Sequence, residues 1–184
     1  MTIQRTSIFL FLILAIAFAS CDAQNPFDTG PPYDLEGNLA KDSLLIVEYL
    51  QTAEIDSLYR IHDPSGVVII VQEEGEGTRP INGNVIYTDY TGSLMSDGSV
   101  FDTTDEDVAK DSDIYVEGRD YRVFTFQINS GTVIQGWDIA FRRLRPGSKA
   151  QLIIPSPWGY RSNSTERIPE NSVLIFDVDF RGIE

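Results

Sequence analysis

The sequence is poor in the residues that most often carry covalent or metal chemistry. It contains one cysteine, Cys21, and one histidine, His62. A single cysteine excludes an intramolecular disulfide, and the two residues together are too few for a metal cluster built on thiolates and imidazoles. A nucleophile activated by a histidine base is equally poorly supported, because a single histidine beside Asp63-Pro64 is typical of a solvated loop residue. We therefore expect neither a cofactor nor a metal site.

Basic residues are also scarce. The chain has 14 Lys and Arg against 28 Asp and Glu, and its formal net charge is −14. Such a surface repels the phosphate backbone of nucleic acids and anionic lipid headgroups. Nucleic acid is therefore excluded as an expected partner.

No apolar run in the sequence reaches the roughly 20 residues that a membrane-spanning helix needs. The run from Ile8 to Ala19 follows a single basic residue, Arg5, and ends in Phe18-Ala19-Ser20-Cys21. This pattern resembles a bacterial lipobox, which predicts a signal peptide over residues 1–20 and acylation of Cys21. The alternative is an ordinary secretory signal followed by an unused thiol. With acylation, the protein is an envelope lipoprotein held by its lipid at the periplasmic face or the outer membrane.

The next two segments differ in composition. Residues 21–37 contain three prolines and little apolar periodicity, which predicts a flexible tether. Residues 38–63 show helical spacing, first from Leu39 to Leu50 and then, more weakly, through Ile55, Leu58 and Ile61. We expect a helical extension that packs on the following domain or on a partner, and a homodimer through this extension is one of the alternatives.

From residue 66 the pattern becomes strand-like. Apolar residues alternate with polar ones around Phe126, Leu152 and Phe176, and Asn82-Gly83 and Asp97-Gly98 are typical turn sequences. Alternation predicts strands with one apolar face, and the short helical pattern from Trp137 to Leu144 is the obvious element to fill that face. The expected fold is α+β, with a curved antiparallel sheet, or half-barrel, wrapped around one short helix in a domain over residues 66–184.

Two polar features admit more than one interpretation. The acidic segment Thr103–Val123 is long for a connection in a compact domain, which indicates either a functional or a mobile insertion. Asp177 and Asp179 share one face of a strand, where paired carboxylates can bind calcium or transfer protons. A solvated strand face is the simpler interpretation of this pair.

Aromatic residues are the strongest functional signal. Several occupy strand ends or the start of the short helix: Tyr90, Phe101, Phe124, Trp137, Tyr160 and Phe176. Ordinary core packing accounts for most such residues. Tyrosine hydroxyls, however, require polar partners, and Asp102 directly follows an inward-facing phenylalanine. A binding cavity with Trp137 as its floor is therefore expected.

The motifs in this part of the chain resemble those of FK506-binding-protein type (FKBP) peptidyl-prolyl cis-trans isomerases. They occur in the family's order over most of the chain after the signal: Tyr90-Thr91-Gly92, Phe101-Asp102, Val133-Ile134-Gln135-Gly136-Trp137, Pro146-Gly147-Ser148-Lys149-Ala150, Ile154-Pro155-Ser156-Pro157-Trp158-Gly159-Tyr160, Ile168-Pro169-Glu170-Asn171 and Leu174-Ile175-Phe176-Asp177-Val178.

The resemblance implies a proline pocket and assigns its lining. The implied residues are Tyr90, Phe101, Asp102, Phe124, Val133, Ile134, Trp137, Tyr160, Ile168 and Phe176. In the family, the backbone amide at the Ile134 position and the hydroxyl at the Tyr160 position donate hydrogen bonds to ligand carbonyls. Two departures bear on substrate preference: Arg161 replaces the usual glycine after the pocket tyrosine, and the segment between Asp102 and Phe124 is longer than in minimal members.

The resemblance implies isomerisation of X-Pro bonds in polypeptide clients, here exported or envelope proteins. It also implies a macrolide ligand of the FK506 or rapamycin kind. Such catalysis requires no nucleophile, base or metal, which agrees with the scarcity of cysteine and histidine. The alternative function is a non-catalytic binding or chaperone subunit of an envelope or gliding-motility complex.

Overall fold

The computed structural model describes residues 32–184, which form one antiparallel sheet and three α-helices. The elements follow in the order α2 (Leu35–Thr52), β1 (Tyr59–His62), β2 (Val68–Glu73), β3 (Val85–Leu94), β4 (Val100–Thr103), α3 (Glu106–Asp111), β5 (Phe124–Gln127), α4 (Gln135–Phe141), β6 (Lys149–Ile154), η1 (Ser156–Trp158) and β7 (Leu174–Ile183). The spatial order of the sheet is β1-β2-β6-β7-β3-β4, and β5 pairs separately with β3.

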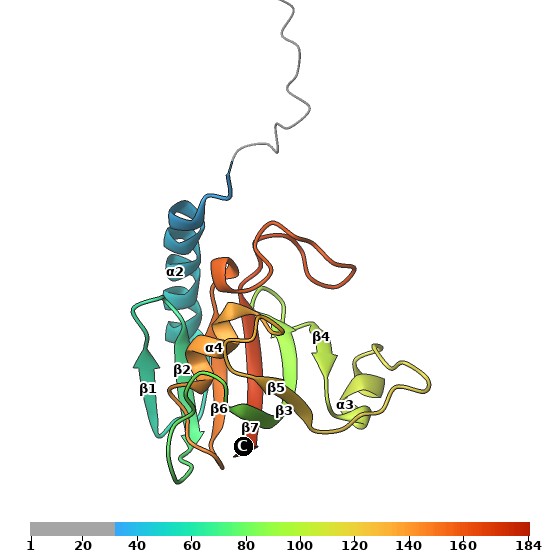
Figure 1. Ribbon diagram of the computed structural model, residues 1–184. Coiled ribbons are helices and arrows are strands. Elements are labelled where there is room, and N and C mark those ends of the chain that lie inside the picture. The colour runs from blue at the N-terminus through green and yellow to red at the C-terminus, as the bar shows by residue number, and fades with distance from the viewer. Residues whose placement is uncertain (1–31) are drawn as a thin grey trace, which may run out of the picture. The chain divides into compact units, whose positions relative to one another are not determined.

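One face of the sheet packs on α4, as Figure 1 shows. Trp137, Phe141 and Leu144 fill the space between this helix and the sheet, and each is at most 3% exposed. Facing them are alternate residues of the strands, such as Leu152 and Phe180. Because strand side chains alternate between faces, this arrangement accounts for the observed periodicity. The predicted α+β architecture is confirmed.

The opposite face of the sheet is also covered, over β2, β6 and β7. Val68, Ile70, Ile153 and Ile175 form a second apolar cluster with Ile46 of α2. The expectation of a sheet with only one apolar face is therefore wrong for these strands. The unbroken run of β-branched residues in β2, buried from Val68 to Val71, reflects this double coverage.

Helix α2 begins earlier than its apolar spacing predicts. Asp34 caps it, and the Asp34 side chain accepts a hydrogen bond from the backbone N–H of Gly37. Residues 35–37, expected in the tether, are thus helical, while residues 21–31 of that tether, the signal peptide and Cys21 lie outside the described residues. Within residues 32–184, no helix has the length and apolar character that crossing a membrane requires.

The expected second helical piece, through Ile55, Leu58 and Ile61, is wrong. The chain instead forms β1, in which Tyr59 pairs with Val71 and Ile61 with Ile69. Residues spaced by three fit a helix, but this stretch is too short to be a stable helix alone, and the edge of β2 offers it a complete ladder. Strand β1, which precedes residue 66, therefore belongs to the same sheet as the later strands.

Segment Thr103–Val123 is partly ordered as a helix. Asp105 caps α3, and its side chain accepts from the backbone N–H groups of Asp107 and Val108. Figure 1 shows α3 and the connection to β5 at the side of the sheet that carries β4. We refer to residues 103–123 as the insertion.

Candidate active site

A cavity of about 420 Å³ opens between α4, the sheet and the turn that follows η1. Its walls come from seven separate segments of the chain. The lining residues are Tyr90, Phe101, Asp102, Phe124, Gly131, Thr132, Val133, Ile134, Trp137, Tyr160 and Phe176. Most of these side chains are apolar, and Asp102 is the charged one, so the cavity is a largely dry site with few polar groups.

Trp137 is the centre of the aromatic lining. Its ring lies 5.1 Å from that of Tyr90, 5.7 Å from Phe124 and 5.2 Å from Phe176, centroid to centroid, and all three pairs are close to perpendicular. Edge-to-face contacts of this kind fix ring orientation, because the positive edge of one ring meets the negative face of another. The rings form a rigid floor and walls before any ligand enters.

Two glycines allow this packing. A Cβ at Gly92 on β3 would lie 2.6 Å from the Phe101 ring and 2.9 Å from the Phe176 ring. A Cβ at Gly136, in the first turn of α4, would overlap the side chain of Ile154. Both positions therefore require glycine for the pocket rings and α4 to lie as close to the sheet as they do.

Asp138 of α4 fixes the turn that supplies another wall. Its carboxylate, 5% exposed, accepts a hydrogen bond from the backbone N–H of Asn129 at 2.7 Å. Asn129 and Gly131 both have positive φ, of 61° and 77°. This bond holds the tight turn between β5 and α4, from which Gly131 to Ile134 reach the cavity.

Asp102 is held by three partners. The Tyr90 hydroxyl donates to one carboxylate oxygen, while the other accepts from Arg119 at 2.7 Å and from the backbone N–H of Thr103 at 2.9 Å. Burial, together with the bond to the Asp102 carboxylate, raises the pKa of Tyr90 above its ordinary value of 10.0. The Tyr90 hydroxyl therefore stays protonated and committed to Asp102.

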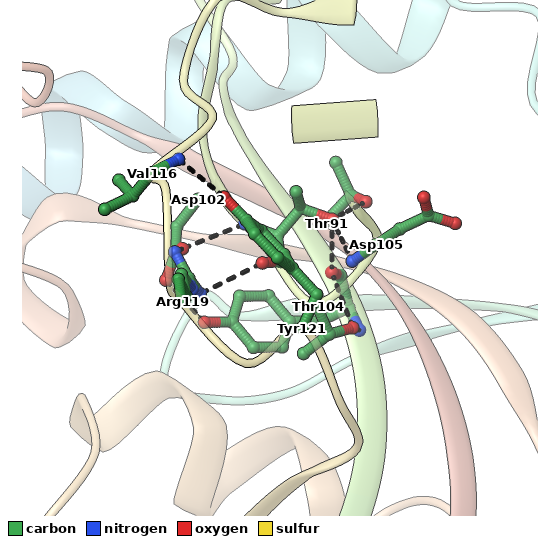
Figure 2. Close-up of polar contacts among 9 residues, drawn as sticks. Thr91, Asp102, Thr104, Asp105, Val116, Arg119 and Tyr121 are labelled. Atoms are coloured by element: carbon green, nitrogen blue, oxygen red, sulfur yellow. Dashed lines mark hydrogen bonds and ion pairs between the residues drawn. The ribbon is translucent and has the colours of Figure 1, made fainter. Parts of the chain in front are cut away.

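Arg119 comes from the insertion, and Figure 2 shows its approach to Asp102. Its second guanidinium nitrogen donates to the carbonyl of Thr103 at 3.0 Å, and the guanidinium lies 4.9 Å from the Tyr121 ring centre. Tyr121 in turn stacks on Tyr115, with ring centroids 5.7 Å apart, and its hydroxyl accepts from the backbone N–H of Val116. The insertion is thus folded on itself and attached to the cavity wall.

Among the polar hydrogens at the cavity that have no partner in residues 32–184 is the buried Nε1–H of Trp137, and two others are the donors expected from the sequence. One is the Tyr160 hydroxyl, whose pKa is raised by burial and by the nearby charge of Asp102, so it stays a donor. The other is the backbone N–H of Ile134, the N-cap of α4, an end where no side chain caps the helix. Both donors border the same cavity, as expected for a site that binds carbonyl oxygens.

The structure brings together nine of the ten pocket residues expected from the sequence. Ile168 is the tenth, and it lines a neighbouring groove of about 290 Å³ together with Phe101, Asp102, Arg119 and Tyr160. Sequence reasoning missed Gly131 and Thr132, although their place just before Val133 was a usable signal. It also missed the ion pair of Arg119, because Arg119 lies 17 positions from Asp102, with α3 and an irregular connection between them.

The two acids on β7 lie away from this cavity. Asp177 is exposed and accepts from the side chain of Gln151 at 2.9 Å, while Asp179 pairs with Arg181 at 3.1 Å. They line a separate shallow hollow on the outer face of the sheet. Among residues 32–184, no group of three or more His, Cys, Asp or Glu side chains is placed to hold a metal ion.

Comparison with known proteins gives relatives that match somewhat less than two thirds of the chain. The chain is 32% identical over 118 residues to FK506-binding protein 4 of Emericella nidulans, covering 64% of this chain and 22% of that protein. It is 34% identical over 112 residues to FK506-binding protein 2 of Aspergillus oryzae, covering 60% of this chain and 74% of that protein. The chain thus spans about a quarter of the length of the FK506-binding protein 4 relatives.

Solved structures show the same fold. FkpA from Escherichia coli matches with a TM-score of 0.59 and 21% identity, covering 100% of this chain and 74% of that one. A peptidyl-prolyl cis-trans isomerase from Pseudomonas syringae matches with a TM-score of 0.59 and 20% identity, covering 84% of this chain and 99% of that one.

The strongest assignment comes from a family model. The model described as FKBP-type peptidyl-prolyl cis-trans isomerase matches residues 76–181, which is more than half of the chain and includes every residue of the cavity lining. Together with the aromatic cavity and its free donors at Tyr160 and Ile134, this match shows that the chain belongs to the FKBP-type peptidyl-prolyl cis-trans isomerase family.

Proposed function

We propose that this protein accelerates the cis-trans isomerisation of X-Pro peptide bonds. The observation that carries the proposal is the preformed aromatic cavity over Trp137, bordered by the Tyr160 hydroxyl and the Ile134 amide. A proline ring fits an apolar cavity of this kind, and the two donors are available to carbonyl oxygens of the bound chain.

The chemistry follows from the peptide bond itself. Resonance gives the C–N bond double-bond character and a rotation barrier of ~18–20 kcal/mol, so an X-Pro bond exchanges over roughly tens to hundreds of seconds. In the transition state the bond is twisted and resonance is lost, which leaves a less polar carbonyl. A dry aromatic wall disfavours the charge-separated planar form more than the twisted form, and therefore lowers the barrier.

Typical free energies indicate how much the hydrogen-bond donors and the apolar walls each lower the rotation barrier. An acceleration of about a thousandfold requires ~4 kcal/mol off the barrier. Two neutral hydrogen bonds contribute ~1 kcal/mol each after exchange with water. Only the part of this energy that is gained in the twisted state lowers the barrier, so the donors at Tyr160 and Ile134 supply at most about half of the ~4 kcal/mol, and the apolar walls supply the rest.

We further propose that the clients are exported or envelope proteins and that the protein is anchored through acylated Cys21. The apolar run that ends at Ser20-Cys21 supports this proposal. Relatives named FK506-binding protein support a macrolide of that kind as a ligand of the same cavity.

The direct test is the rate of isomerisation of a short X-Pro peptide with and without the full-length chain. We expect acceleration that a macrolide suppresses, and we expect Asp179→Ala, outside the cavity, to behave as the wild type. Trp137→Ala, checked for folding by circular dichroism, should lose macrolide binding. A folded wild-type chain that leaves the exchange rate at its value in buffer would exclude the isomerase function and favour a binding subunit, which a stoichiometric co-purifying partner would then identify.

A further inference from the structure

Asp42 of α2 is a buried carboxylate outside the cavity. It is 4% exposed, although acids on helices usually face solvent. One of its oxygens accepts two hydrogen bonds, from the backbone N–H and from the hydroxyl of Ser156, both at 2.7 Å. A carboxylate is buried at such a position only where its charge is compensated by donors, so these bonds define the role of Asp42. They join α2 to the first residue of η1.

Ser156 in turn fixes the backbone on both sides of Tyr160. Its side chain is fully buried, and its carbonyl accepts from the backbone N–H of Gly159 at 3.0 Å and of Arg161 at 3.1 Å. The residue between these two donors is Tyr160, whose hydroxyl borders the cavity. A shift of Ser156 therefore moves both neighbours of the Tyr160 side chain.

Arg161, which stands where the family usually has glycine, lies in the same turn. Arg161 has a φ of 58°, a backbone conformation that explains why glycine is usual at this position in the family. Its Nε donates to the carbonyl of Pro157 at 3.0 Å, and its guanidinium lies 5.9 Å from the centre of the Tyr33 ring. Contacts from η1 and from Tyr33, two residues before α2, thus hold Arg161 in an unfavourable backbone conformation.

We propose that Asp42 is a positioning residue of the isomerase site, which fixes the Tyr160 hydroxyl through Ser156. This inference rests on the proposed isomerase function. It makes α2, which precedes the matched residues 76–181, a part of the catalytic unit as well as a cover for the sheet. A donor held in place before the ligand enters loses no freedom on binding, so its contribution to the transition state depends on the parts that hold it.

The first test measures the turn directly and needs no activity. In Asp42→Ala the backbone N–H groups of Ser156, Gly159 and Arg161 should exchange with solvent at least about tenfold faster than in the wild type. Glu48→Gln neutralises an exposed acid of the same helix and should leave their exchange unchanged. Wild-type protection of the three groups in Asp42→Ala would overturn the inference whether or not the protein is an isomerase.

The second test separates positioning from a general loss of stability. We expect Asp42→Ala to lower kcat/KM by roughly threefold to tenfold and by no more than Tyr160→Phe does, mainly through kcat, at a temperature where the variant is folded. In a Tyr160→Phe background the same change should have an effect of about twofold or less, because the group that it positions is gone. An equal loss in both backgrounds would show that Asp42 acts elsewhere.

Asp42→Asn covers the case in which the alanine variant does not fold. It keeps the size and one oxygen acceptor but loses the charge, so its amide exchange and its kcat/KM should lie between those of the wild type and the alanine variant. Wild-type values of both quantities in a chain with Asp42→Asn and Ser156→Ala combined would contradict the proposal. If the wild-type chain has no isomerase activity, the proposed function fails, and the exchange measurement still decides whether Asp42 holds the turn that carries Tyr160.

Discussion

At the scale of single residues, the two tyrosines of the cavity differ in their hydrogen bonds. Tyr90 donates to Asp102, whereas the Tyr160 hydroxyl has no partner among residues 32–184. A donor already used inside the protein stabilises the fold, and an unused donor is available to a ligand. The same chemical change, loss of one hydroxyl, should therefore have opposite consequences at the two positions.

Tyr160→Phe should leave stability within about 0.5 kcal/mol of the wild type and lower kcat/KM by roughly threefold to tenfold, the value of one hydrogen bond made in the transition state. Tyr90→Phe removes a donor from the Asp102 carboxylate and should cost about 1–2 kcal/mol of unfolding free energy. Urea unfolding and the peptide assay measure both quantities. The assignment of roles fails if the two variants lose stability equally.

The raised pKa values of Tyr90 and Tyr160 predict a loss of stability in alkali. Burial raises both, with the bond to Asp102 adding to the shift of Tyr90. In the unfolded chain both return to about 10, so the folded state binds protons more tightly. The stabilisation is complete below about pH 10 and is lost as the pH rises through the folded pKa values. Unfolding free energies between about pH 8 and pH 11 should show a decline that is shallower in Tyr90→Phe.

At the scale of elements, α2 has two faces with different surroundings. Ile46 is 3% exposed and packs against the sheet, whereas Leu44, two positions earlier, is 74% exposed. The self-association expected from the sequence stays a prediction, and Leu44, Leu45 and Val47 are the large apolar side chains that this helix leaves exposed.

Ile46→Ala should lower the free energy of unfolding by about 2–4 kcal/mol, because it removes buried methylene groups and leaves a cavity between α2 and the sheet. Leu44→Ala changes a similar side chain on the same helix and should stay within about 0.5 kcal/mol of the wild type. Thermal or urea unfolding at one fixed protein concentration compares them. Equal losses would mean that α2 does not rest on the sheet through Ile46.

The insertion contributes one charged contact to the cavity. Arg119→Gln breaks the pair with Asp102, in which both side chains are about a third exposed, so the expected loss of stability is only about 0.5–1 kcal/mol. Protease cleavage within residues 103–123 should become faster, because this contact attaches the insertion to the wall. Arg122→Gln, whose side chain is 78% exposed, is the matched control and should be cleaved at the wild-type rate. Unchanged cleavage of Arg119→Gln would place the attachment elsewhere.

At the scale of the whole molecule, the sequence predicted what depends on local periodicity. The alternation around Phe126, Leu152 and Phe176 identified strands, and the pattern from Trp137 identified α4, because each has a buried face that repeats with its own geometry. The cavity lining followed from family motifs on these elements.

What escaped prediction depends on contacts between distant segments. The bond between Asp42 and Ser156 joins residues 114 positions apart, and no local pattern marks Asp42 as buried except its place one turn before Ile46. Likewise, the spacing of Ile55, Leu58 and Ile61 fits a short helix, but the pairing of Ile61 with Ile69 of β2 makes this stretch a strand. Tertiary contacts of this kind select among local structures that the sequence alone leaves nearly equal.

The proposed attachment of this domain to a membrane depends on Cys21, which lies outside the described residues. In the proposed lipoprotein, acyl chains hold the full-length protein at the membrane, since the free energy of burial is ~0.8 kcal/mol per CH₂ group and two or more chains make anchoring stable. Cys21→Ser in a bacterial host should abolish incorporation of labelled palmitate and move the protein from the membrane to the soluble envelope fraction. Thr2→Ser, elsewhere in the same signal, should leave both unchanged.

Because the cavity residues all follow residue 89, the released Cys21→Ser protein should keep the wild-type kcat/KM on a soluble X-Pro peptide. Palmitate labelling that persists in Cys21→Ser would exclude this anchor.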